Sequence, residues 1–206
     1  MMLHIVNGYE RSQPEYKGLI DQMHQLRARS FHDRRGWRVT VQDGREIDAF
    51  DDLDPLYVLV SDGAGRLAAS LRLLPTTGPY MMSEVFPEVL GPQGVIRHPQ
   101  IWESSRFCVD TEVARDFGTD SVNRVTRMLL AGMFRTAFEA GMINIVSVYD
   151  VYVERILKRA GCTFERLGPV VTYDKGLRTT SGLFEVSAES VARLEVALEE
   201  KARVLA

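Results

Sequence analysis

Two strand-like segments joined by a short turn limit what this chain can fold into. Residues 57–60 and 67–74 are rich in apolar side chains, and the link Ser61-Asp62-Gly63-Ala64-Gly65 has the composition of a hairpin connection. Strands joined this closely pair antiparallel, because a parallel pair needs a crossover of a dozen or more residues. The hairpin therefore excludes a sheet that is parallel throughout.

Other helices and strands alternate irregularly along the chain. Apolar spacing predicts helices over residues 14–31, 120–140 and 151–160, a closing helix from 187 to about 204, and a brief turn near 82–85. Strands are predicted over residues 3–6, 101–109, 143–149, 170–173 and 183–186, and irregular chain over 34–45 and 75–99. The expected fold is α/β, a mixed sheet between helices in one domain over residues 1–206.

Expected helix ends carry capping residues. Thr119 or Asp120 can cap the helix over residues 120–140, and Gly141 stops it. Gly161 ends the next helix, and Ser187 caps the closing one.

The bulk composition excludes several classes of protein. The 45% apolar and 26% charged residues are ordinary for a globular protein, and a net charge of -3 argues against general nucleic-acid binding. The start of the chain has no signal-peptide core, and no run approaches the ~18 apolar residues of a spanning helix. A cytoplasmic location is expected. The spacing of Cys108, Cys162 and the four histidines predicts neither a disulfide framework nor a metal site.

Charged residues recur where a strand pattern would exclude them. Glu103 and Arg106 lie within the apolar segment 101–109, and Arg72 interrupts a run of leucines. Buried charges need partners and indicate a functional site. A surface ion pair remains the alternative for Glu103 and Arg106, which point to opposite faces of a regular strand unless a bulge intervenes. Arg72 could also extend from its strand to solvent.

Three further candidates lie earlier in the chain. Asp48 and Asp51 form an acidic segment whose alternative is a solvated loop, and Arg27 could lie on the polar side of its helix. Trp37, in a polar loop, could anchor the core or form the wall of a ligand pocket.

Four charged and aromatic motifs follow one another in a fixed order. They are an arginine with two aromatics, an Asp-x-x-Asp pair, a strand arginine before Pro-Thr-Thr, and a Glu-x-Ser-Arg-Phe strand. The residues, in order, are Arg27, Phe31 and Trp37; Asp48 and Asp51; Arg72 before Pro75, Thr76 and Thr77; and Glu103, Ser105, Arg106 and Phe107. This order resembles the acyl-homoserine-lactone synthases, the LuxI-type autoinducer synthases. The clear match spans residues 26–110, and a weaker one continues through 146–161.

The resemblance implies an acyltransferase of quorum sensing. Such an enzyme joins the α-amine of S-adenosylmethionine to an acyl thioester; the methionine carboxylate then closes a lactone and methylthioadenosine leaves. S-adenosylmethionine is then a substrate, so no cofactor is expected. The acyl donor is acyl carrier protein or acyl-coenzyme A. The implied fold is a mixed, largely antiparallel sheet sandwiched by helices, as in the coenzyme A-dependent N-acetyltransferases (GNAT-like).

The resemblance also implies roles for individual residues. The catalytic set contains Glu103, the base for the substrate amine, with Arg106, Asp48, Asp51, Arg27 and Arg72. S-adenosylmethionine would contact Phe31, Trp37, Ser105 and Phe107. The acyl chain would contact Ser104, Val146, Ser147, Tyr149 and Leu157, and an acidic carrier protein would dock on Arg155, Lys158 and Arg159. Pairing among the acids and arginines themselves stays open, as does a solvated face for the three basic residues.

The acyl chain is expected to be straight and of medium or long length, with branched and aromatic acyl groups left open. Ser147 stands at about the place where the family has a threonine when the chain is oxidised at the third carbon, so a 3-oxo or 3-hydroxy group is compatible. A serine bonded to its own backbone is the alternative.

Two rival functions arise from the same residues. A general coenzyme A-dependent N-acyltransferase would use the loop Arg115-Asp116-Phe117-Gly118-Thr119-Asp120 for pyrophosphate, but Asp120 places an acid where a small residue is needed. A non-catalytic ligand-binding module is the second rival, and an intact Glu103 argues against it.

Overall fold

The computed structural model describes residues 1–118, 120–173 and 176–204, without the side chains of 121, 122 and 197–204. The chain forms two compact units, one of Met1–Leu74 with Arg106–Leu129 and one of Pro75–Ser105 with Leu130–Ala206. The single domain predicted over residues 1–206 stays a prediction. Within the described residues, no helix is both long and apolar enough to cross a membrane.

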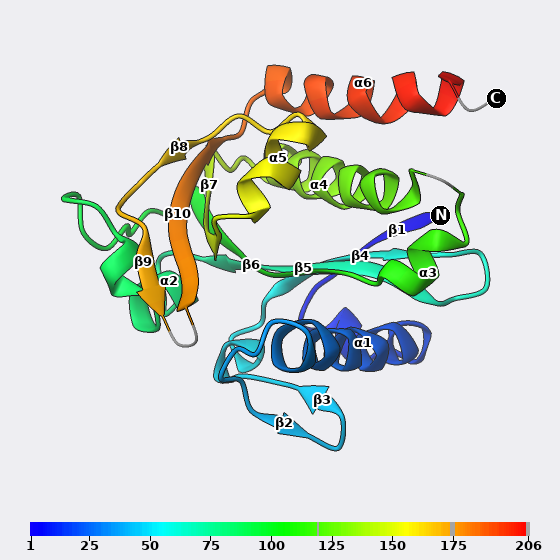
Figure 1. The fold of residues 1–206 in the computed structure, drawn as a ribbon, viewed down its shortest axis with the longest axis horizontal. Coiled ribbons are helices and arrows are strands. Elements are labelled where there is room, and N and C mark those ends of the chain that lie inside the picture. The colour runs from blue at the N-terminus through cyan, green and yellow to red at the C-terminus, as the bar shows by residue number, and fades with distance from the viewer. Residues whose placement is uncertain (119, 174–175, 205–206) are drawn as a thin grey trace. The chain divides into compact units, whose positions relative to one another are not determined.

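The first unit is built on antiparallel strands covered by helix α1. β1 (Met2–Val6) pairs with β4 (Leu56–Ser61), which pairs with β5 (Leu67–Pro75), and the second half of β6 (Ile101–Val109) follows β5. The predicted β4–β5 hairpin is thus confirmed. Figure 1 shows α1 (Pro14–Arg27) along one face of these strands, where its buried residues Leu19, Met23 and Leu26 share a core with Tyr57 and Leu59.

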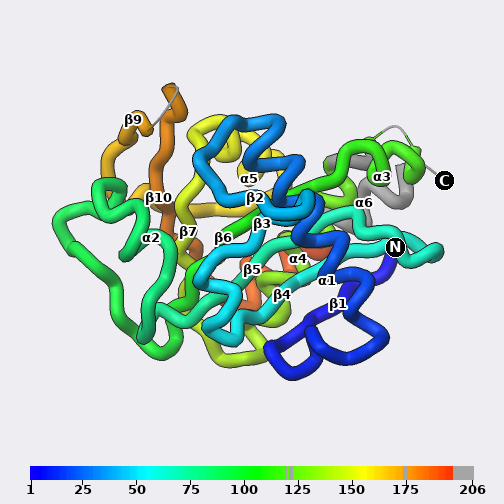
Figure 2. Tube along the Cα trace, turned by 90° about the horizontal axis from the view of Figure 1, so that it is seen from below, coloured from blue at the N-terminus to red at the C-terminus, as the bar shows by residue number. Residues whose placement is uncertain are grey.

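The segment after α1 differs from the sequence prediction. The helix expected to run to residue 31 ends at Arg27 and continues as a wider π-helical turn, Ala28–Asp33. The expected loop at 34–45 contains β2 (Val41–Gln42), which pairs with β3 (Arg45–Glu46) through Asp43 and Gly44, both at positive φ. An Asp-Gly pair suits such a turn, yet strands of two residues are too short to show alternation. Figure 2 shows this hairpin and α1 from below.

The second unit holds a mixed set of strands. The first half of β6 runs parallel to β7 (Asn144–Asp150), from Ile101↔Asn144 to Ser104↔Ser147. β7 is antiparallel to β10 (Leu177–Glu185), which also pairs with β8 (Glu165–Arg166) and β9 (Val171–Tyr173). The fold class, a mixed and largely antiparallel sheet with helices on its faces, is confirmed.

Short and long helices complete both units. They are α2 (Met81–Glu84), α3 (Thr111–Arg115), α4 (Ser121–Glu139), α5 (Val153–Ala160) and α6 (Ala188–Val204). α3 was not predicted. Gly141 (φ 74°) and Gly161 (φ 96°) end α4 and α5 in the left-handed conformation, as expected. The Ser187 side chain accepts from the Ser190 amide at 3.2 Å and so caps α6. Thr119, the alternative cap of α4, lies outside the described residues.

β10 begins six residues earlier than its prediction over 183–186. Its first half contains Thr179, Thr180 and Ser181, none of which is exposed to solvent. This hydroxyl-rich run shows no apolar alternation, so the pattern that reveals a half-buried strand is missing. Pairing with β7, from Thr179↔Asp150 to Glu185↔Asn144, establishes the strand instead.

Candidate active site

Arg27, in the last turn of α1, lies at the centre of a buried ionic cluster. Its two terminal nitrogens donate to the two carboxylate oxygens of Asp51, each at 2.8 Å, and its Nε donates to Glu46 at 2.5 Å. The side chain is fully buried. The planar fork of a guanidinium matches a carboxylate in this two-point geometry, which a lysine cannot reproduce.

The spacing of Asp48 and Asp51 has a local structural reason. Asp48 caps a short 3-10 turn, Ala49–Asp52, that follows β3, and Asp51 is the third residue of that turn. Asp48 accepts from the amide of Phe50 at 2.9 Å, and Asp51 accepts from the amide of Asp48 at 2.9 Å. This reciprocal cap holds both carboxylates in fixed directions. The solvated acidic loop considered for this segment is therefore wrong for Asp51, whose side chain is only 4% exposed.

Strands β4 and β5 add two more donors to Asp51. Arg72 of β5 donates to Asp51 at 2.8 Å and to Asp48 at 2.6 Å, and the Tyr57 hydroxyl of β4 donates to Asp51 at 2.7 Å. Tyr57 and Arg72 are register partners, so both side chains leave the same face of the sheet. The Arg72 side chain is fully buried, so it does not extend to solvent.

Arg106 completes the cluster from β6. Its Nη2 lies 2.8 Å from Glu46 and 2.7 Å from Asp48. Its backbone has φ 55°, a left-handed conformation that is uncommon for a residue with a side chain and interrupts the regular strand. Its guanidinium carbon lies 5.1 Å from the centroid of Phe31, whose ring meets Trp37 edge-on at 6.0 Å.

The charges in this cluster balance. The three guanidinium groups of Arg27, Arg72 and Arg106 face the three carboxylates of Glu46, Asp48 and Asp51. The pairing among acids and arginines that the sequence left open is thus present. Asp48, at 18% side-chain exposure, is the most exposed of the six.

Burial and pairing act against each other on the ionisable groups. Burial favours the neutral acid, but the hydrogen bond and charge of Arg27, with the charge of Arg72, hold the pKa of Asp51 far below its ordinary value. Burial likewise opposes the charge of Arg27, while Asp51 and Glu46 hold its pKa above the usual range. Burial and the charge of Asp51 raise the pKa of Tyr57, so its hydroxyl stays a donor.

Glu103, the predicted base, is held by backbone amides of the second unit. Its carboxylate oxygens accept from the amides of Met81 at 2.9 Å and Met82 at 2.6 Å, at the start of α2. The residue is fully buried. The surface ion pair considered as its alternative is therefore wrong. Thr76 of the Pro-Thr-Thr motif donates to the carbonyl of Ile101 at 2.7 Å and so fixes the start of β6.

The predicted acyl-binding residues lie on β6, β7 and α5. Ser147 and Tyr149 share one face of β7, whereas Val146 points to the other face. Ser147 Oγ donates to the carbonyl of Ser104 at 2.7 Å. Leu157 is buried on the inner side of α5. A role in acyl binding stays a prediction for all of them.

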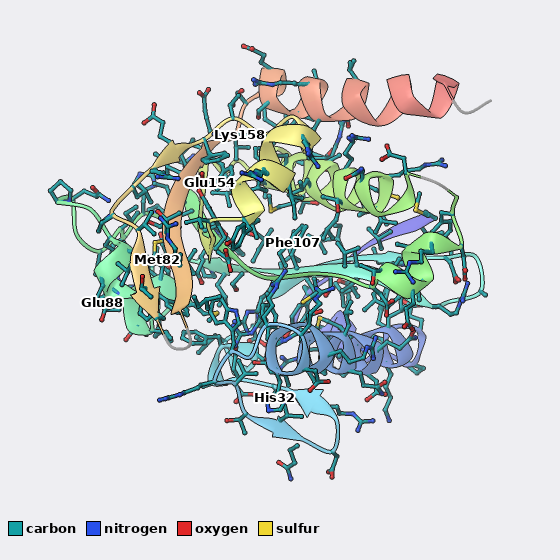
Figure 3. The ribbon with its side chains drawn as sticks, in the orientation of Figure 1. His32, Met82, Glu88, Phe107, Glu154 and Lys158 are labelled. Atoms are coloured by element: carbon teal, nitrogen blue, oxygen red, sulfur yellow. The ribbon has the colours of Figure 1, made fainter. Side chains whose placement is uncertain are left out.

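The predicted docking residues share the exposed side of α5. Arg155, Lys158 and Arg159 are all exposed, whereas Glu154 on the same helix is buried and pairs with Arg166 at 2.6 Å. Figure 3 shows Glu154 and Lys158 projecting from α5. The remaining predicted contacts of S-adenosylmethionine are Ser105, which is buried, and Phe107, which is half-buried on β6 (Figure 3).

Sequence reasoning missed two members of the cluster and one pair of donors. Glu46 and Tyr57 were not among the candidates, and neither were the amides of Met81 and Met82. Charge counting gave no signal for Glu46, because Glu103, Asp48 and Asp51 already matched the three candidate arginines in number. Tyr57 and the two amides had no signal either, since strand pairing and a turn bring them into place.

Known proteins resemble this chain over most of its length. The sequence model of the family described as autoinducer synthase matches residues 11–194. This protein belongs to the autoinducer synthase family. A probable acyl-homoserine-lactone synthase of Sinorhizobium fredii is 42% identical over 150 residues, 73% of this chain and 72% of that protein. The acyl-homoserine-lactone synthase of Agrobacterium fabrum is 39% identical over 160 residues, 78% of this chain and 74% of that protein.

Solved structures agree with the family and the fold. The AHL synthase LasI superposes with a TM-score of 0.80 at 32% identity, covering 97% of this chain and 94% of LasI. The CoA-dependent acyl-homoserine lactone synthase BjaI, solved with SAM and isopentyl-CoA, superposes with a TM-score of 0.84 at 27% identity. The match covers 96% of this chain and 89% of BjaI. An N-acetyltransferase from Lactobacillus plantarum, described as putative, gives 0.59 at 14% identity, over 91% of this chain and 100% of its own, and shows the shared fold alone.

The ionic cluster predicts a large cost for removing one acid. We expect Asp51→Asn to lower the free energy of unfolding by about 3–5 kcal/mol, because the buried arginines keep their charge while the opposing charge is lost. Denaturant unfolding at neutral pH measures this. The matched control is Asp52→Asn, one residue on and exposed, which should change stability by less than about 0.5 kcal/mol.

The pH dependence of stability provides a second test of the Asp51→Asn substitution. Because the folded pKa of Asp51 lies below its unfolded value near 3.8, its contribution to stability is complete above about pH 5 and is lost as the pH falls toward the folded value. The difference between wild type and Asp51→Asn should therefore shrink only in acid. Equal stability of the two proteins at pH 7 would contradict this account.

Proposed function

We propose that this protein makes an N-acyl-L-homoserine lactone from S-adenosylmethionine and an acyl thioester. The observation that carries the proposal is that five of the ordered charged residues fold with Glu46 into one balanced, buried cluster instead of scattering over the surface; they are Arg27, Asp48, Asp51, Arg72 and Arg106. The amine attacks the thioester carbon, and the thiol leaves. The methionine carboxylate then attacks the carbon beside the sulfonium, which expels methylthioadenosine. S-adenosylmethionine is consumed as a substrate, and the proposal needs no cofactor.

Glu103 acts as the base in this proposal. The amine of an amino acid is largely protonated near neutral pH, so a proton must be removed before attack. Two backbone amides orient the Glu103 carboxylate, at 2.6 Å and 2.9 Å, and a carboxylate oxygen can accept more than one hydrogen bond, including one from an amine or a bridging water. A carboxylate with fixed direction is what proton transfer requires, because such a transfer depends on hydrogen-bond geometry first.

The ionic cluster supports binding mainly through its rigidity. Its acids are already neutralised by arginines, so a sulfonium would find little net attraction in the buried part. Asp48, the most exposed acid, is the member suited to a cation, and Arg106 beside it is suited to the substrate carboxylate. Phe31 and Trp37 offer aromatic faces for the adenine.

The attacked carbonyl needs hydrogen-bond donors as its negative charge develops. Backbone amides from Ser104 to Phe107 are proposed as the source, because the left-handed backbone of Arg106 departs from regular strand geometry within this stretch. Preorganised donors of this kind are often the largest single contribution to catalysis of acyl transfer.

The general N-acyltransferase is the weaker alternative. In such an enzyme the loop before the long helix would hold pyrophosphate with backbone amides. Here Asp120 lies in that place, bonded to Asn123 and 3.7 Å from Arg127. A carboxylate beside pyrophosphate is unfavourable, so this loop gives that function little support.

The central experiment identifies the product directly. Purified protein is incubated with S-adenosylmethionine and a panel of acyl-carrier-protein and coenzyme A thioesters, and products are analysed by mass spectrometry. We expect an N-acyl-homoserine lactone and methylthioadenosine in equal amounts. Acetyl transfer to another amine, with no lactone from any thioester, would establish the alternative instead.

The role of Glu103 predicts a loss of turnover. Glu103→Gln should lower kcat by roughly 10²–10⁴-fold, the usual range for a lost general base. Because the glutamine NH2 group would face one of the two backbone amides, some loss of stability is also expected, so kcat and melting temperature are measured together. The control is Glu84→Gln, at an exposed acid on α2, the helix whose first amides hold Glu103. Turnover near the wild-type value would exclude Glu103 as the base.

The acyl donor is proposed to be an acyl carrier protein, on the strength of the exposed basic face of α5. Reversing charge at Arg155 and Lys158 should raise KM for carrier-bound donors, because carrier proteins are strongly acidic. KM for S-adenosylmethionine should not change, and Arg178→Glu, an exposed basic position on β10, is the control. A wild-type preference for coenzyme A donors that survives the reversal would favour coenzyme A as the donor.

A further inference from the structure

Tyr149, on β7, has a buried hydroxyl group without a hydrogen-bond partner among the residues that the structure describes. The residue is only 7% exposed, and its Oη makes no hydrogen bond to any described residue. Buried tyrosine hydroxyls normally have a partner, because leaving one unpaired is costly. A ligand bound beside Tyr149 can therefore supply the hydrogen-bond acceptor that the described residues do not.

The surroundings of the hydroxyl are aromatic. The Tyr149 ring meets Phe164 and Phe184 edge-on, with centroids 6.0 and 6.3 Å away. Burial, and then the negative charge of Glu154, raise the pKa of Tyr149, so the group stays neutral and can donate. Glu154 itself is engaged with Arg166 in a two-point ion pair at 2.6 and 2.8 Å.

Gly182, on the neighbouring strand β10, makes room for this hydroxyl. A Cβ atom at this position would lie 2.6 Å from Tyr149 Oη and 3.3 Å from the same ring. Such an approach is far inside normal contact, and the tyrosine ring cannot bend away as a flexible chain could. A side chain at 182 would thus displace the hydroxyl, and glycine preserves its position.

Ser147 presents a contrast two residues earlier on the same face of β7. Its hydroxyl proton is already donated to the carbonyl of Ser104 at 2.7 Å. A hydroxyl has only one proton to donate, so Ser147 can accept but has no second donor. Of these two hydroxyls, that of Tyr149 has a donor left for a ligand.

We propose that Tyr149 Oη donates a hydrogen bond to an oxygen carried on the acyl chain of the donor thioester. The ligand class is an acyl group with a carbonyl or hydroxyl oxygen beyond the thioester carbon, and Tyr149 selects it over a plain hydrocarbon chain. An unsubstituted chain would bury the same hydroxyl and leave it unpaired. The inference rests on the proposed function and adds a selectivity residue to it.

The test compares Tyr149→Phe with wild type on two donors of equal chain length, one with a 3-oxo or 3-hydroxy group and one unsubstituted. The ratio of kcat/KM for the oxygenated over the unsubstituted donor should fall roughly three- to tenfold, the size expected for one lost neutral hydrogen bond. Activity on the unsubstituted donor should be retained, and the melting temperature without donor should not fall. An unchanged ratio, or an equal loss on both donors, would overturn the proposal.

Three further variants sharpen the result. Gly182→Ala should lower the same ratio, because the added methyl group displaces the hydroxyl, whereas Ser147→Ala should leave it unchanged. Tyr173→Phe is the matched control, since that hydroxyl is already paired with Glu88 at 2.7 Å.

A ratio that shifts in Ser147→Ala but not in Tyr149→Phe would overturn the assignment. A wild type that makes no lactone from any donor refutes the proposed function, whereas lactone formation with an unchanged ratio refutes only this inference.

Discussion

The two-point pairing of Arg27 with Asp51 is the interaction on which the first unit depends. It joins the end of α1 to the turn after β3, and Tyr57 and Arg72 attach the same carboxylate to β4 and β5. Removing such charges from water costs several kcal/mol per ion and is offset only when geometry is good and the remaining hydrogen-bonding positions are filled. Asp51 meets that condition, because both of its oxygens accept from more than one donor.

A balanced cluster of this kind fixes geometry more than it adds stability. Apolar residues of similar volume could fill the space at comparable or lower free energy, whereas loss of a single partner is expensive. Because losing one partner costs more than replacing the whole cluster, each arginine needs its acid, and Glu46 is the third acid beside Asp48 and Asp51. In the proposed function the same balance limits the direct role of the acids in attracting a sulfonium, and Asp48, the least buried of the six, is therefore the acid proposed to face the substrate.

The sequence predicted the features that depend on local pattern, and failed where distant segments decide. The hairpin at residues 61–65, the helix stops at Gly141 and Gly161, and the Ser187 cap come from local chemistry. Glu46 was missed because its burial depends on a two-residue strand that packs on α1. The start of β10 was missed because its buried residues carry hydroxyls, one of which, that of Ser181, donates to the distant carbonyl of Val89 at 2.5 Å. A hydropathy pattern does not contain that information.

Arg106 links the electrostatics of the cluster to the shape of β6. A residue with a side chain at positive φ costs of order 1–3 kcal/mol and persists only where its surroundings enforce it. The contacts of the Arg106 guanidinium with Glu46 and Asp48 provide that enforcement, since they fix the side chain from two directions. In a regular strand, Glu103 and Arg106 would point to opposite faces; a left-handed residue breaks the alternation and re-aims the side chains after it. Glu46 of β3 and Asp48 after it thus hold the backbone conformation of Arg106, which lies in the stretch whose amides are proposed to receive the developing charge.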